Sequence, residues 1–186
     1  MTRFALKRPW AALLLVPLLA TPSVSFGADA APRRPWGFNE PYLTTGFTYY
    51  GSDRRVLAGL GGGPGYRFHL NDLIGFYAEA RWVDYTGNAV TGALGASITF
   101  PLGPLEPLVG LQGTIFAGDR VQVIDSAHPV PPSPIAWAGQ VRLAPLRFVH
   151  APFTVTTLSG DVGFGIDAKT LALAITISIL DIGVRF

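Results

Sequence analysis

Apolar and polar residues alternate along the last segment of the chain. The alternating sets are Leu180, Ile182, Val184 and Phe186 on one side of an extended backbone, and Asp181, Gly183 and Arg185 on the other. A two-residue period of this kind indicates a β-strand with one apolar face and one polar face. An apolar face turned outward and a charged face turned inward are typical of strands in membrane barrels.

The same period recurs in eight segments that are separated by turn residues. These segments cover residues 42–50, 56–68, 73–85, 90–100, 105–118, 135–148, 153–166 and 171–186. The connections after the second, fourth and sixth segments are short, including a turn at 101–104, whereas the longest connection, 119–134, follows the fifth and is rich in proline. Short turns at one end and a longer loop at the other are typical of outer-membrane barrels. We therefore predict an all-β protein, an eight-stranded antiparallel up-and-down transmembrane β-barrel.

The eighth segment changes the parity of its apolar residues. Ile175, Ile177 and Ile179 have one parity, and Leu180 and Ile182 have the other. A β-bulge near Ile179 and Leu180 would restore a single outward face, because an inserted residue is the usual cause of such a switch. Without a bulge, one half of this strand would point its apolar side chains into the barrel.

The N-terminus has the pattern of a secretory signal peptide. A positive region is followed by the short apolar run 11–20 and by small residues that suit cleavage after Gly27 or Ala30. The run is too short for a membrane anchor, which needs about 20 apolar residues. We predict a signal peptide at 1–27, an irregular periplasmic tail at 28–40 and an outer-membrane barrel at 41–186. The predicted location is the bacterial outer membrane.

The charge balance depends on whether the signal peptide is present. The whole chain has 14 Lys and Arg residues, 12 Asp and Glu residues and a net charge of +2. Removing Arg3, Lys7 and Arg8 leaves eleven basic residues against twelve acidic ones, a net charge of −1. A basic stripe for nucleic acid is therefore not expected. Because the chain has no cysteine, we expect neither disulfides nor a thiolate metal site.

Charged residues occur on the polar face of the predicted strands. They are Arg67, Glu79, Arg81, Arg142, Asp161, Asp181 and Arg185. Such residues are costly when they face lipid at mid-depth, so they are expected to point into the lumen. An eight-stranded barrel is just wide enough to be filled by side chains. Opposite charges packed there would form a stabilising ion network, and the alternative is a path for ions or protons.

Several motifs resemble one family. A glycine-rich strand with Gly-Tyr-Arg at 65–67 is followed by the turn residues Asn71 and Asp72 and by Glu-Ala-Arg-Trp at 79–82. Together with Gly-Val-Arg-Phe at 183–186, they resemble the OmpA/OmpX-type superfamily of small outer-membrane barrels over residues 41–186. The resemblance implies insertion by the barrel assembly machinery, which would recognise Ile182, Val184 and Phe186 on the last strand.

The expected function is structural or partner-docking, with outer-membrane lipid around the barrel and the stiff external loop 119–134 as a docking element for an envelope protein. A small channel is one alternative. A soluble lipocalin-like barrel that binds lipid is another, and Trp82, Phe164 and Val184 would then face a ligand.

No enzyme activity, metal or cofactor is expected. The three histidines, at 69, 128 and 150, fall in separate connections without metal-ligand spacing. His128 lies close in sequence to Asp125 and Ser126, but adjacent residues in a proline-rich loop lack the supported geometry that a catalytic triad needs.

Overall fold

The computed structural model describes residues 37–52, 55–84, 88–118, 122–123, 135–167 and 170–186. Nine strands lie within these ranges. They are β1 (Phe38–Gly51), β2 (Arg55–His69), β3 (Ile74–Asp84), β4 (Asn88–Thr99), β5 (Leu108–Gly118), β6 (Gln122–Val123), β7 (Ile135–His150), β8 (Phe153–Asp167) and β9 (Thr170–Val184). The predicted signal peptide lies outside the described residues, as do most of the 119–134 loop and its residues Asp125, Ser126 and His128.

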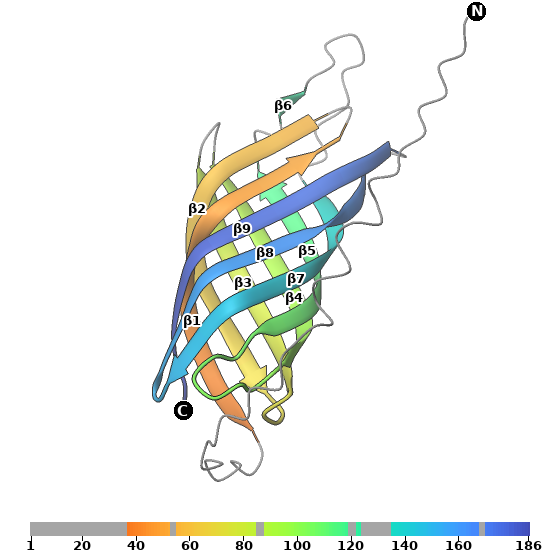
Figure 1. Ribbon diagram of the computed structural model, residues 1–186. Coiled ribbons are helices and arrows are strands. Elements are labelled where there is room, and N and C mark those ends of the chain that lie inside the picture. Colours follow the sequence, from red (N-terminus) through yellow and green to blue (C-terminus); the bar gives the residue numbers. More distant parts are fainter. Residues whose placement is uncertain (1–36, 53–54, 85–87, 119–121, 124–134, 168–169) are drawn as a thin grey trace, which may run out of the picture. The chain divides into compact units, whose positions relative to one another are not determined.

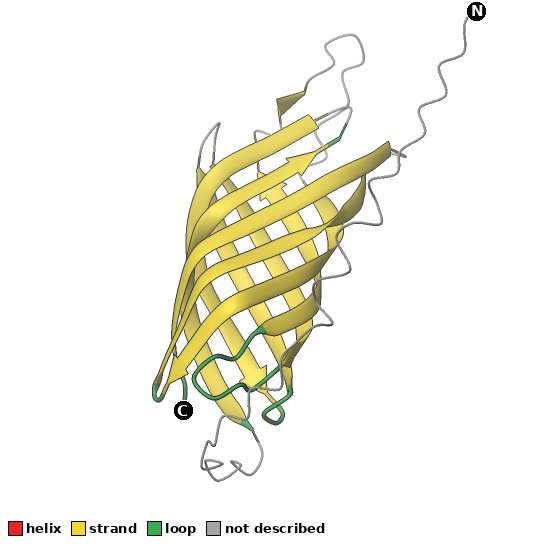
Figure 2. Ribbon diagram, viewed as in Figure 1, coloured by secondary structure: helices red, strands yellow, loops and turns green. Residues whose placement is uncertain are grey.

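Eight long strands close into one antiparallel barrel, as the sequence predicts (Figure 1). Each long strand pairs with its neighbours along the chain, and β1 pairs with both β2 and β9 to close the barrel. The strands are strongly tilted, and Figure 2 shows that the described residues consist of strands joined by short loops. No helix among those residues is long and apolar enough to cross a membrane.

Several element boundaries differ from the prediction, and most differ by one to three residues. β1 begins at Phe38, so the last three residues of the segment 28–40, predicted as an irregular tail, are strand. Pro41 lies near the start of β1, where a missing N–H is tolerated. β2 ends at His69, which is therefore a strand residue rather than part of a connection, and His150 likewise ends β7.

The connection between β4 and β5 is longer than the turn predicted at 101–104. It covers residues 100–107 and lies against β7. The Glu106 N–H donates to the Arg147 carbonyl at 2.7 Å, and the Val149 N–H donates to the Pro104 carbonyl at 2.8 Å. This connection therefore continues the edge of the barrel beyond the start of β5. We call the end of the barrel formed by 70–73, 100–107 and 151–152 the short-turn end, and the opposite end the loop end.

A short ninth strand extends the loop end. Gln122 and Val123 pair with Val56 and Arg55 at the start of β2, beyond the point where β3 covers that strand. The sequence does not predict β6, because two residues are too few to show a period.

The strands alternate between an exposed apolar face and a buried face. Along β3, Phe76 and Trp82 are 50% and 58% exposed, whereas Glu79 and Arg81 are 7% and 3% exposed. The outward residues form an apolar belt around the barrel, and the inward residues fill it. The core of the protein is therefore its lumen.

The predicted bulge in the last strand is confirmed. Ile179 and Leu180 are both exposed, and they are flanked by the buried Ser178 and Asp181. The pairing of β9 with β1 shifts register at this point, because Ile179 has no partner on β1. The apolar residues on both sides of the bulge therefore face outward.

The bulge in β9 belongs to a row that crosses three neighbouring strands. β7 has two consecutive exposed residues at Pro145 and Leu146, and β8 has two at Thr157 and Leu158. The ladder between β7 and β8 is irregular here, and the ladder between β8 and β9 skips two residues on each strand. Because each of these strands contains one extra residue at the same height, their registers agree on both sides of the row.

The loop end of the lumen is apolar. Its buried cluster consists of Tyr50, Leu57, Val83, Ala89, Phe116, Ala136, Ala138, Ala172 and Ala174. The rings of Tyr50 and Phe116 pack with their centroids 4.8 Å apart. Charged and uncharged polar residues, together with aromatic residues such as Tyr42 and Tyr77, occupy the rest of the lumen.

Candidate functional site

The structure places the predicted charged residues inside the barrel. Those that are buried are Arg67, Glu79, Arg81, Arg142, Asp161 and Asp181, and Arg185 is partly exposed at the short-turn end. They separate into two groups. The central network surrounds Glu79 and Asp161, and the end cluster surrounds Glu40.

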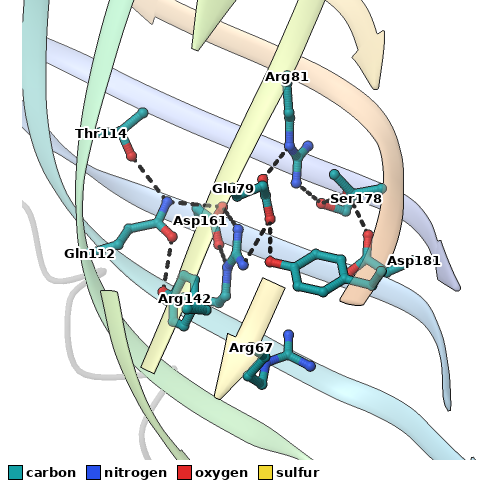
Figure 3. A network of polar contacts seen from close by, with 12 residues as sticks. Arg67, Glu79, Arg81, Gln112, Thr114, Arg142, Asp161, Ser178 and Asp181 are labelled. Atoms are coloured by element: carbon teal, nitrogen blue, oxygen red, sulfur yellow. Dashed lines mark hydrogen bonds and ion pairs between the residues drawn. The ribbon is translucent and has the colours of Figure 1, made fainter. Parts of the chain in front are cut away.

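Glu79 on β3 is the hub of the central network (Figure 3). Arg81, two residues further along the same face of β3, donates from Nε to Glu79 Oε1. Arg142 on β7 donates from Nη1 to Glu79 Oε2 at 3.1 Å, and the Tyr42 hydroxyl on β1 donates to the same oxygen at 2.9 Å. A single carboxylate therefore joins three strands across the lumen.

Asp161 on β8 is held by Arg142 on the neighbouring strand. Two hydrogen bonds, from Nε to Oδ1 at 2.7 Å and from Nη2 to Oδ2 at 2.8 Å, make a bidentate pair. The Gln112 amide donates to Asp161 at 3.2 Å and to Gln140 at 3.1 Å. The Arg142 guanidinium also lies 4.7 Å from the centre of the Tyr77 ring. These contacts tie together both halves of the barrel wall.

Asp181 on β9 has a different environment. The Thr44 hydroxyl on β1 donates to Asp181 Oδ1 at 2.5 Å, so the contact crosses the seam where the two ends of the chain meet. Arg81 Nη2 donates to Ser178 at 2.5 Å on the same strand as Asp181. The central network therefore extends from β8 through β3 to the seam.

The end cluster contains residues that the sequence does not single out. Glu40 pairs with Arg67 at 2.5 Å, with Arg147 at 2.5 Å and with Arg185 at 3.4 Å. Glu106, from the connection 100–107, pairs with Arg147 at 2.9 Å and with Arg185 at 2.8 Å. Two carboxylates and three guanidinium groups therefore close the short-turn end.

His69 packs into the same end cluster. Its Nε2 lies 3.3 Å from Glu40 Oε2, and its ring stacks on Phe38 with the centroids 4.0 Å apart. The side chain is fully buried. The structure therefore makes His69 part of the lumen packing.

Glu106 lies outside the strands and is accessible from the short-turn end. Burial raises the pKa of its carboxyl, but hydrogen bonds and the positive charges of Arg185 and Arg147 outweigh burial, so the pKa of Glu106 is below its ordinary value. Glu106 is therefore charged at neutral pH and holds the connection 100–107 over the end of the lumen.

Charges of opposite sign balance among the described lumen residues. The positive ones are Arg67, Arg81, Arg142, Arg147 and Arg185, and the negative ones are Glu40, Glu79, Glu106, Asp161 and Asp181. Four of the carboxylates pair with arginine, and Asp181 accepts a hydrogen bond from Thr44 instead. The four pairs support the interpretation as a stabilising ion network, because buried charges persist where they are paired and hydrogen-bonded.

The described residues contain no group of three or more His, Cys, Asp and Glu side chains that could hold a metal ion. Most of the buried polar side chains described above form hydrogen bonds or ion pairs with one another.

The three residues predicted for recognition by the assembly machinery lie on the outer face of the last strand. Ile182, Val184 and Phe186 are 50%, 39% and 67% exposed. The Phe186 backbone pairs with Asn39, with hydrogen bonds of 2.9 and 3.0 Å. In the closed barrel, these residues are therefore accessible from the surrounding medium through their side chains, while their backbone is engaged with β1.

A closed eight-stranded antiparallel barrel with strands in sequential order, apolar outside and charged inside, is the fold of the small outer-membrane barrels. Solved structures of that class are similar to this chain. The N-terminal β-barrel domain of Pseudomonas aeruginosa OprF matches with a TM-score of 0.54 and 16% identity, covering 81% of this chain and 99% of that one. Neisserial surface protein A (NspA) matches with a TM-score of 0.50 and 12% identity, covering 80% of this chain and 95% of that one.

At these identities, the likeness concerns the fold. The sequence matches no protein-family model, and no curated protein matches it.

Proposed function

We propose that this chain is a bacterial outer-membrane protein whose filled, non-conducting barrel serves as a structural or partner-docking component of the cell envelope. One observation carries the proposal: the apolar residues of a closed barrel face outward all round, while its charges are paired inside. Such an apolar surface suits lipid. A closed barrel can also lie in lipid because it leaves no edge strand with unpaired backbone groups.

The outer surface is unsuited to water. Leu94, Leu111 and Leu171 are 70%, 68% and 68% exposed, and further large apolar side chains surround them on every strand of the barrel. Soluble monomers rarely expose contiguous apolar patches larger than a few hundred Å². The lipocalin-like alternative requires the reverse arrangement, but Trp82 and Phe164, which would have to face a ligand, point outward and are 58% and 57% exposed.

Detergent extraction tests the location. We expect the protein to stay in the outer-membrane fraction after washing with high salt and to enter solution only with detergent. Folded and heated samples should migrate differently on a denaturing gel, since a closed barrel resists detergent until it is heated. Release by salt alone would contradict the proposal.

The filled lumen predicts the absence of a steady current. The central network crosses the barrel and the apolar cluster closes the loop end, so ions would have to displace both. Reconstituted protein in planar bilayers should therefore show no defined conductance steps. The small-channel alternative predicts such steps under the same conditions, so this measurement separates the two functions.

The partner-docking role is assigned to the loop 119–134. Of this loop, the described residues Gln122 and Val123 pair with the start of β2. The pairing supports the assignment, because it gives a proline-rich loop a fixed attachment to the rim of the barrel. The proline content of the loop sequence leads us to expect a stiff loop, and a stiff loop loses little entropy when a partner binds.

A length-preserving change tests docking without altering the barrel. Replacing Pro131, Pro132 and Pro134 by serine should leave heat-modifiable folding intact and reduce the recovery of a partner cross-linked in whole cells. A matched control is the substitution of Pro104 by serine at the opposite end of the barrel. Equal recovery from the parent and from the loop variant would contradict a docking role for this loop.

A further inference from the structure

The seam between β1 and β9 poses a problem that the other strand pairs do not. Every other pair of long strands joins neighbours in the order of the chain, with the short strand β6 lying between β5 and β7. A connecting turn helps to set the register of a hairpin, but β1 and β9 have no such turn. In the structure, Thr44 faces Asp181, 137 residues away.

The outward side chains of the seam do not by themselves determine the register in which β1 and β9 pair. Leu43 faces Ile182, and Phe47 faces Ile177, so apolar side chains meet lipid on both sides. A slip of one residue would turn every side chain to the wrong face and is strongly opposed. A slip of two residues keeps the apolar face outward. The competing registers are therefore those displaced by two.

We propose that two features of the seam, the close approach of the β9 backbone to Gly46 beside the bulge and the Thr44–Asp181 pair, select the single register in which the barrel closes. We call these two features together the seam key. The inference rests on the closed barrel and not on the proposed cellular role.

The first part of the seam key is steric. A Cβ atom added to Gly46 would lie 2.0 Å from the Ile177 carbonyl oxygen and 2.7 Å from the Ser178 Cα atom, both on the backbone of β9. The bulge at Ile179 lies directly beside this point. A slip of two residues would bring Thr44 or Thr48 to the place of Gly46, and both carry a Cβ. Only glycine permits so close an approach.

The second part of the seam key is polar. Thr44 donates to Asp181 at 2.5 Å and lies 3.4 Å from the Ser178 hydroxyl. A slip of two residues separates Thr44 from Asp181 and leaves a buried carboxyl without this donor, which is unfavourable. The Glu40–Arg185 pair, at 3.4 Å, crosses the same seam closer to the short-turn end and also favours the observed register.

Engineered cysteines can report the register, because the chain has none of its own. The full chain is refolded in detergent with Leu180→Cys paired in turn with Thr45→Cys, Leu43→Cys or Phe47→Cys. Thr45 faces Leu180 in the observed register, and the other two would face it after slips of two residues. Only directly opposed cysteines are close enough to form a disulfide without backbone movement.

The unaltered seam should cross-link through the Thr45→Cys pair. Gly46→Val and Thr44→Asp should each reduce that cross-link at least about tenfold, the effect of a change of about 1.4 kcal/mol between registers. The exchanged variant Thr44→Asp with Asp181→Thr restores one hydroxyl opposite one carboxyl and should recover the cross-link. Thr114→Asp, which adds a carboxyl to the lumen on β5, is a matched control that should keep it.

Two results would overturn the seam key. One is a native cross-link that persists at full yield in Gly46→Val and in Thr44→Asp. The other applies if Thr44→Asp does not form a heat-modifiable barrel. In that case the exchanged variant Thr44→Asp with Asp181→Thr is expected to form the barrel and the native cross-link. If it does not, the polar part of the seam key is refuted.

Discussion

Arg142 on β7 donates two parallel hydrogen bonds, of 2.7 and 2.8 Å, to Asp161 on the neighbouring strand β8. The same guanidinium reaches Glu79 at 3.1 Å on the far side of the lumen. One planar side chain therefore neutralises two buried carboxylates, which a lysine cannot do with the same geometry. Both arginine and aspartate are almost fully buried, so neither can exchange its partner for water.

Replacing Arg142 by leucine should therefore be strongly destabilising. The change leaves Asp161 and Glu79 buried with one cation fewer, and breaking a buried pair in this way costs about 3–5 kcal/mol of the free energy of unfolding. Urea unfolding of the refolded protein in detergent or lipid vesicles measures the loss. Arg142→Lys should be intermediate, because it keeps the charge and loses the bidentate contact.

The double variant Arg142→Leu with Asp161→Leu provides the control, because it removes an opposite charge together with the arginine. It should recover part of the lost stability. A loss below about 1 kcal/mol in the single variant would mean that water reaches this part of the lumen and screens the pair, as at a protein surface.

Phe116 and Phe164 offer a comparison of one residue type on the two faces of the wall. Phe116 is 1% exposed and packs on Tyr50, whereas Phe164 is 57% exposed on the outside. Phe116→Ala should lower the free energy of unfolding by about 3–5 kcal/mol, because it leaves a cavity. Phe164→Ala should cost clearly less, since lipid can fill the space. Equal losses in vesicles would contradict the assignment of the lumen as the packed core.

Glu106 should give the connection 100–107 a pH-dependent contribution to stability. Its pKa in the folded protein is below the ordinary 4.5. Its charged form therefore stabilises the fold fully above about pH 4.5, and the contribution is lost as the pH falls through the folded pKa. Glu106→Gln should be less stable than the parent at pH 7, with the difference shrinking below pH 4.5. Unfolding midpoints from pH 3 to 7 measure this, and a difference that does not change with pH would contradict it.

Deleting Ile179 should prevent correct closure. Without the extra residue, either Ser178 and Thr176 or Asp181 would turn towards lipid, while apolar neighbours would turn inward. We expect loss of the heat-modifiable form on gels. Ile179→Ala keeps the residue and should retain that form. A deletion variant that folds as well as Ile179→Ala would show that β9 can shift its register without penalty.

Alternation predicts most of the barrel because lipid and lumen impose opposite preferences on successive residues. Arg67, Glu79 and Arg81 lie in long runs of that period, so their inward direction follows directly from the sequence. The switch of parity at Ile179 also has one simple physical cause, an inserted residue. The inward or outward direction of most strand residues can therefore be predicted from the alternation within a single segment.

The sequence predicts Arg67 and Arg185 of the end cluster, but it does not single out Arg147, Glu40 and Glu106. Arg147 follows the two consecutive outward residues Pro145 and Leu146, so simple alternation would turn it outward. Glu40 precedes Pro41 near the start of β1, where few residues show a period, and Glu106 lies in a connection. All three acquire their role only through contacts between segments far apart in the chain. Periodicity within one segment cannot predict such contacts.

The row of bulges across β7, β8 and β9 has an evolutionary consequence. An extra residue in one strand alone would put that strand out of step with both neighbours, whereas the three extra residues keep β7, β8 and β9 in step with one another on either side of the row. We therefore expect the three extra residues to be inherited together. Homologous chains should gain or lose the residues equivalent to Pro145, Thr157 and Ile179 together, and an alignment that treats each gap separately would misplace all three.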